Sequence, residues 1–110
     1  MQSIPVLSLT ATANGAVSEK TFVGHNGATA TAAGNTLGVA KFDAADTEGL
    51  TVDVLGTAIV TAGGAFSAGA ELQVGSNGKA VVKAAGVTVA RALQAATADG
   101  ESVEVLLIQN

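Results

Sequence analysis

The chain holds few side chains that could carry out chemistry. His25 is its only histidine, and it lies in the Gly-His-Asn-Gly segment of residues 24–27, a composition typical of a turn. The chain has no cysteine, and no carboxylate stands close to His25 in the sequence. A histidine without such neighbours is a poor metal ligand or general base. We therefore expect His25 to be a solvated turn residue.

Asp43, Asp46 and Glu48 form the one acidic cluster of the sequence. Several oxygens from one loop suit a hard cation such as calcium. The spacing does not match an EF-hand loop, and the residues 51 positions later are Gln, Thr and Asp. The pattern favours a solvated acidic loop over a calcium site.

Catalytic motifs are missing from the sequence. There is no Gly-x-x-x-x-Gly-Lys-Ser/Thr phosphate loop, no Gly-x-Ser-x-Gly, and no Ser/His/Asp set in a plausible order. The absence of cysteine removes a disulfide framework, thiolate metal sites and thiol nucleophiles. We therefore predict a protein that is not an enzyme and that has no cofactor and no metal site.

The composition predicts a protein that is held by neighbours. Charged residues make up 13% of the chain and the net charge is −4, which argues against nucleic acid as a partner. The 48% of apolar residues are mostly Ala and Val, with three Phe and no Trp or Tyr, so the core should be thin and gain from oligomerisation. No apolar run approaches the ~20 residues of a membrane helix, and the first residues lack a signal-peptide pattern. We expect no membrane partner.

The alternation of apolar and polar residues predicts an all-β fold. The clearest run is residues 50–64, where Leu50, Val52 and Val54 share one face and Gly56 marks a bulge or bend. Eight further strands are expected at residues 4–13, 20–24, 28–32, 37–43, 71–75, 79–84, 87–96 and 102–109. Residues 87–96 could also form one short helix, and we favour the strand. A single-domain β-barrel or β-sandwich over residues 1–110 follows.

An internal repeat links the two halves of the chain. Shifted by 51 residues, the sequence matches itself from Val23 to Leu55, with the Asn-Gly turn of residues 26–27 falling on that of residues 77–78. Residues 15–18 resemble 64–67 at a slightly different offset. We interpret residues 15–56 and 64–107 as two similar β-units that share one core. Chance similarity in a low-complexity sequence is the alternative.

The start of the chain is the best interaction candidate. Residues 1–5 could form an N-terminal arm, because Pro5 cannot donate to a strand ladder and alternating apolar residues follow it. An ordinary first strand of the protein's own sheet is the equally open alternative. The residues expected to contact a capsid or another subunit are Gln2, Ser3, Ile4, Pro5, Val6 and Leu7.

Several segments resemble the small capsid decoration proteins of tailed phages, also called cement proteins. The segments are residues 52–58 (Val-Asp-Val-Leu-Gly-Thr-Ala), 62–65, 68–72, the hairpin 76–80 and the closing 103–108, so the resemblance covers nearly the whole chain. It implies a structural protein that binds the outside of a phage head and reinforces the shell. It also implies a homotrimer, the major capsid protein as partner, and a virion component made in the bacterial host cytoplasm. The family has no catalytic residues.

Two functions from other classes remain as alternatives. A carbohydrate- or cell-surface-binding β-module would need exposed aromatic residues, and three Phe without Trp or Tyr are few for that role. A small hydrolase would need a nucleophile–base pair, which the sequence does not offer.

Overall fold

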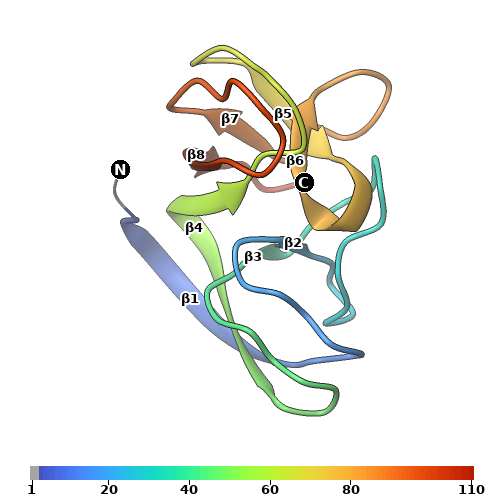
Figure 1. Ribbon diagram of the computed structural model, residues 1–110. Coiled ribbons are helices and arrows are strands. Elements are labelled where there is room, and N and C mark those ends of the chain that lie inside the picture. The colour runs from blue at the N-terminus through green and yellow to red at the C-terminus, as the bar shows by residue number, and fades with distance from the viewer. Residues whose placement is uncertain (1–2) are drawn as a thin grey trace.

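The computed structural model describes residues 3–110 and shows an all-β, nearly closed antiparallel barrel (Figure 1). The prediction of an all-β fold built from two similar units is confirmed. The strands are β1 (Pro5–Thr12), β2 (Phe22–Val23), β3 (Gly38–Ala40), β4 (Gly49–Thr61), β5 (Glu71–Val74), β6 (Ala80–Val82), β7 (Ala90–Ala92) and β8 (Ser102–Leu107).

The long strand β4 joins the two halves of the molecule. Its first part pairs with β1 on one side and β3 on the other, and residues 57–61 pair with β8. Gly56 stands between the two parts with φ +96°, beside shifts in the β1–β4 register. A side chain at Gly56 would collide with the backbone of residues 4–6, so the expected bend needs glycine there.

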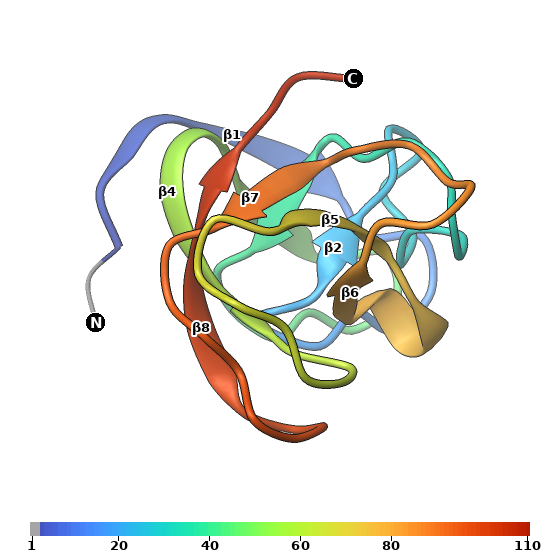
Figure 2. The ribbon, with the colours of Figure 1, turned by 90° about the horizontal axis from the view of Figure 1, so that it is seen from above.

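The remaining strands curl round until they meet β4 again. The order is β2-β3-β4-β8-β7-β5-β6, with β1 on the free side of β4. A parallel bridge from Ala62 to Ala80, with Gly63 N donating to Ala80 O at 2.7 Å, returns β6 to the end of β4. Seen from above, the strands enclose the core of the second half (Figure 2).

Eight of the nine expected strands are present. Residues 28–32 make only a bridge from Thr29 to Val23, because the chain then turns away and Ala33 bonds to Val74 and Val87 instead. Residues 90–92 form β7, so the helical alternative for 87–96 is wrong. Within residues 3–110, the one helical turn is the 3-10 turn Ser76–Gly78, and no helix is long and apolar enough to cross a membrane.

Two clusters of buried residues fill the molecule. The larger one holds most of the second half together with Phe22, Ala30 and Val39 of the first. The smaller one, around Leu50 and Val52, belongs to the first half. Phe22 is fully buried in the larger cluster, so the two halves share a core as the sequence predicts.

The hydrogen bonds of residues 5–53 recur in residues 54–106. The reciprocal pair Val17–Ala44 recurs as Phe66–Ala96, and the turn bond from Gly24 N to Ala28 O recurs from Gly75 N to Lys79 O. The pairing of β2 with β3 recurs in that of β5 with β7. We call these stretches the first and second units.

The offset between equivalent positions is not uniform. It is 49 residues at Val17 and Phe66, and 51 at the Asn-Gly turns. It rises to 52 at Ala44 and Ala96, because each loop of the second unit is one or two residues longer. By this correspondence β1 is the counterpart of the second part of β4: Ser8 pairs with Asp53 as Thr57 pairs with Leu106.

Candidate functional site

Strand β1 is exposed on both faces. Val6 is 77% exposed and Ile4, just before the strand, is 57% exposed. Leu7 and Leu9 each keep more than two fifths of their surface in solvent. In the second unit, Ala58 stands in the place of Leu9 and is only 1% exposed. An apolar strand so open to water marks a surface that another molecule can cover.

One edge of β1 is bonded to β4 and the other carries free donors. Ala13 N donates to Glu48 O across the β1–β4 ladder at 2.8 Å. Because donors alternate along an antiparallel strand, the N–H groups of Ser8, Thr10 and Thr12 point away from β4. Among residues 3–110, none of these three has a backbone partner on that side.

No charge protects this edge. The sequence from residue 1 to residue 18 has no charged side chain, and the first one is Glu19. Soluble proteins usually guard a long exposed edge with lysine, bulges or a covering segment. Only Pro5 at the start of β1 serves that purpose here.

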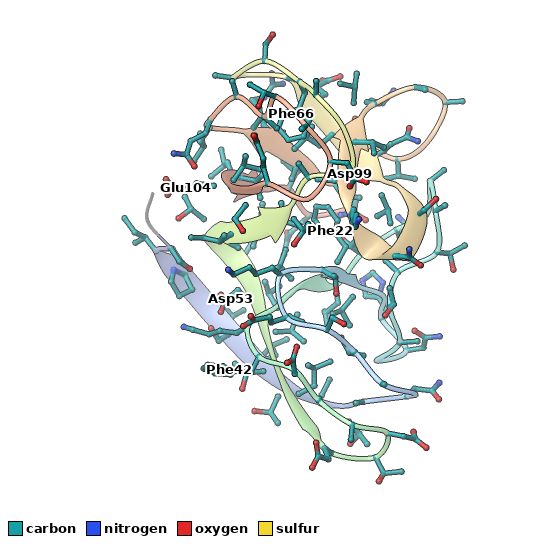
Figure 3. All side chains as sticks on the ribbon, viewed as in Figure 1. Phe22, Phe42, Asp53, Phe66, Asp99 and Glu104 are labelled. Carbon is teal, nitrogen blue, oxygen red and sulfur yellow. The ribbon has the colours of Figure 1, made fainter. Side chains whose placement is uncertain are left out.

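A half-open cavity of about 200 Å³ lies beside the start of β1. Its walls are formed by Ser3, Lys20, Val39, Ala40, Lys41, Phe42, Asp53 and Ile59. Asp53 is 3% exposed, and its Oδ1 accepts a bond of 2.6 Å from Ser8 Oγ. Phe42 is 58% exposed, and Figure 3 shows Phe42 and Asp53 on the flank formed by β1. The cavity therefore extends the apolar surface of β1 around the sheet.

Two lysines give this flank a positive rim. Lys20 and Lys41 line the cavity, and neither forms an ion pair within the described residues. The ion pairs of the described chain are Lys79 with Asp99 and Arg91 with Glu71, both in the second unit. An incoming carboxylate would find both cavity lysines available.

The residues predicted to form contacts lie on this flank. Ser3 lines the cavity, and Pro5, Val6 and Leu7 begin β1. Ile4 N donates to Thr57 Oγ1 at 2.8 Å, and Ile4 O accepts from Thr57 N at 3.1 Å, so residues 4–12 are paired with their own sheet. Gln2 lies outside the described residues. Their role in contact stays a prediction.

Sequence reasoning missed Leu9, Phe42, Lys20, Lys41 and Asp53 as members of the same surface. The uncharged run from residue 1 to residue 18 was a usable signal for β1. No short-range pattern brings Lys20, Phe42 and Asp53 together, because the β3–β4 pairing and the fold of the first unit do so.

The acidic cluster fixes loops. Asp43 Oδ1 accepts from Glu19 N at 2.7 Å, and Asp46 Oδ1 accepts from Gly15 N at 2.9 Å. Glu48 Oε1 accepts from Ala45 N at 2.7 Å. Within residues 3–110 no group of three or more His, Asp or Glu side chains could hold a metal ion. These carboxylates act on the backbone of the first unit.

His25 is exposed, as expected for a turn residue. It borders a shallow cavity of about 270 Å³ with Thr36, Leu37, Val54, Gln109 and Asn110. Asn110 Oδ1 accepts from Thr36 N at 2.7 Å, which ties the last residue to the first unit. No carboxylate or second imidazole lines this cavity, so His25 has no partner there for acid–base chemistry.

Comparison with known proteins gives one family and one fold. A family model described as phage cement protein matches residues 1–107. The crystal structure of the N base of the head fiber gp8.5 of bacteriophage phi29 is similar, with a TM-score of 0.78 and 20% identity over 93% of each chain. At that identity the likeness concerns the fold alone. No curated protein matches the sequence.

Proposed function

The chain belongs to the phage cement protein family, and on that premise we propose that it binds the outside of a phage head and stabilises the shell. The family makes it a structural protein of the phage head. In our proposal its partner is the major capsid protein, its copies form homotrimers, and it performs no catalysis. It is made in the bacterial host cytoplasm and ends on the outer surface of the virion.

The observation that carries this proposal is the exposed flank of β1. Eight uncharged residues with both faces open form the strand, and Phe42 extends the apolar surface beside it. A freely diffusing protein gains nothing from such a surface, whereas a protein that covers a shell buries it. The predicted contact residues, Gln2 to Leu7, lie at the start of this flank or directly before it.

Repetition on a shell compensates for modest contacts. A thin core of Ala and Val offers little binding energy per copy. When subunits of one oligomer bind neighbouring capsid proteins together, the second contact forms at high effective concentration. Each oligomer then holds adjacent capsid proteins in place, which is how a small protein can strengthen a large shell.

The test uses heads of the phage that encodes the chain, assembled without it. Purified protein is added, and binding is followed by cosedimentation. Saturable binding, followed by a higher temperature for DNA release, is the expected result. Light scattering on the free protein should give three times the monomer mass. Absence of binding to mature heads would remove the proposal.

A further inference from the structure

Resting on the proposed function, we infer that the free edge of β1 is filled by an extended segment of the shell protein, which adds to the sheet as a further strand. The incoming segment takes up the N–H groups of Ser8, Thr10 and Thr12. It carries apolar side chains toward β1 and an acidic side chain toward Lys20 and Lys41. A second copy of this chain does not fill the edge.

The internal repeat shows that this edge is incomplete. In the second unit, the counterparts of Ser8 and Thr12 are Thr57 and Thr61. Thr57 N donates to Ile4 O at 3.1 Å, and Thr61 N donates to Lys20 O at 2.8 Å. The first unit thus satisfies the outward donors of the second part of β4. The equivalent donors of β1 have no such neighbour, although the strand geometry is the same.

Another copy cannot supply the missing acceptors in the same way. The second-unit counterparts of Ile4 and Lys20 are Asp53 and Gly69. Asp53 is held between β1 and β3, and Gly69 O accepts from Arg91 Nη1 at 2.9 Å. The internal contact between the units therefore cannot be repeated from one chain to the next.

Strand pairing between copies is also excluded for a three-fold oligomer. The outer side of β2 is bonded to residues 29–30, and that of β6 meets Ala62 and Gly63. Within residues 3–110, β1 is the one strand longer than four residues with a free edge. A three-fold ring joins two different surfaces of each chain, whereas two β1 edges can pair only about a two-fold axis. In a trimer, the edge stays open for another protein.

The chemistry of the flank describes the incoming segment. Val6, Leu7 and Leu9 offer apolar contacts on both faces of β1, so the segment should be apolar on both of its faces. Main-chain bonds would give affinity, and the neighbouring cavity would give specificity. The two unpaired lysines of that cavity favour a carboxylate at the Ser3 end of the segment.

The decisive variant is Thr10→Pro with Thr10→Val as its matched control. Proline removes an outward N–H and leaves the β4 side of the ladder intact, which edge strands tolerate. We expect Thr10→Pro to bind heads about tenfold more weakly or worse, while Thr10→Val binds like the wild type. Val6→Lys should show a similar loss because a charge on an edge blocks strand addition. Ala85→Lys, in the exposed loop between β6 and β7, controls for added charge.

Hydrogen exchange on the wild-type protein tests the same pairing without any substitution. On binding to heads, the amides of Ser8, Thr10 and Thr12 should become protected. Lys20→Ala with Lys41→Ala should weaken binding less than Thr10→Pro and flatten its salt dependence. Circular dichroism of each variant verifies that it folds, and the exchange result stands even if Thr10→Pro does not.

The outcomes separate the two proposals. If the wild type fails to bind heads, the proposed function is wrong. If it binds, but Thr10→Pro binds equally and the three amides stay unprotected, the strand addition is wrong and the proposed function stands. If the amides become protected in free protein as its concentration rises, a second copy fills the edge and the inference is overturned.

Discussion

The two units build the same backbone from different side chains. At two equivalent left-handed positions, the first unit has Lys20 and Thr47 (φ 60° and 71°) where the second has Gly69 and Gly100 (φ 86° and 95°). Positive φ costs a residue with a Cβ roughly 1–2 kcal/mol, and a β-branched residue is an outlier there. The first unit therefore retains strain that the second avoids.

Polar side chains also act differently in the two units. Asp43 and Asp46 bond to loop N–H groups in the first unit, and alanines occupy the corresponding loop of the second. The second unit instead holds both ion pairs of the described chain and the larger buried cluster. The difference teaches that the second unit is the stable platform, while the first carries strain, pinned loops and the open strand β1.

The largest expected effect tests whether the platform is shared. Phe22 comes from the first unit but is fully buried in the larger cluster. Phe22→Ala should cost about 3–5 kcal/mol of unfolding free energy. Both units should still unfold in one transition, because they share that cluster. Chemical denaturation followed by far-UV circular dichroism measures this, since the chain has no Trp or Tyr.

Phe42→Ala is the matched control for Phe22→Ala. Phe42 is 58% exposed, so its loss should change stability by less than about 1 kcal/mol. Two separate transitions in wild type or Phe22→Ala would show that the units are independent domains, against the shared core.

The second effect exchanges residues between equivalent left-handed positions. A side chain at Gly100 would meet no atom within 4 Å, so Gly100→Thr tests backbone strain alone. We expect it to destabilise the protein by about 1–2 kcal/mol. The reverse change, Thr47→Gly, should stabilise it by up to about 1 kcal/mol, because added flexibility of the unfolded chain offsets part of the relief. Equal signs for the two changes would contradict the correspondence of Thr47 with Gly100.

The third effect compares a carboxylate that binds backbone with one that binds a lysine. Asp46→Ala removes the acceptor of Gly15 N and should cost about 1 kcal/mol. Asp99→Ala breaks a 3.0 Å ion pair with Lys79 at the surface and should cost no more than about 0.5 kcal/mol. Asp46→Asn retains an acceptor and should recover most of the loss. Thermal melts at low and high salt distinguish the two, since only the ion pair should weaken with salt.

Much of this comparison could be predicted from residue patterns, and the reason for the rest is physical. Alternation placed the strands, and the Asn-Gly pairs marked equivalent turns. A gapless shift of 51 residues assigned Val52 to Val103, although the structure matches it to Val105. Both are buried, because a two-residue slip keeps a side chain on the same face of a strand.

The same slip hid two functional relationships. Glu48 corresponds to Glu101 and not to Asp99, and β1 corresponds to the second part of β4. Loop lengths that differ by one or two residues leave no trace in a low-complexity sequence. The exposure of Leu9 was equally hidden, because it depends on what lies across the outer edge of β1 and not on the strand's own pattern.

The smallest expected effect concerns the pair of equivalent glutamates. Glu48 accepts one bond, from Ala45 N, whereas Glu101 accepts from Thr97 Oγ1 at 2.6 Å and from Thr97 N at 2.8 Å. The Thr97 hydroxyl first, and then its N–H, hold the pKa of Glu101 below the ordinary value of 4.5. Because the folded pKa is depressed, the stabilisation is present above pH 4.5 and is lost as the pH falls through the folded value.

Removing the hydroxyl should erase most of this difference between the units. In Thr97→Ala, the pKa of Glu101 should rise toward 4.5, while Thr97→Ser should keep it low because serine supplies the same donor. NMR titration of the Glu101 side chain measures both, and melting temperatures between pH 3 and pH 6 should show a shallower acid slope for Thr97→Ala only. An unchanged pKa in Thr97→Ala would mean that the backbone N–H alone sets the shift. The two loops would then be electrostatically alike, and the second unit's advantage would come from its glycines and its core.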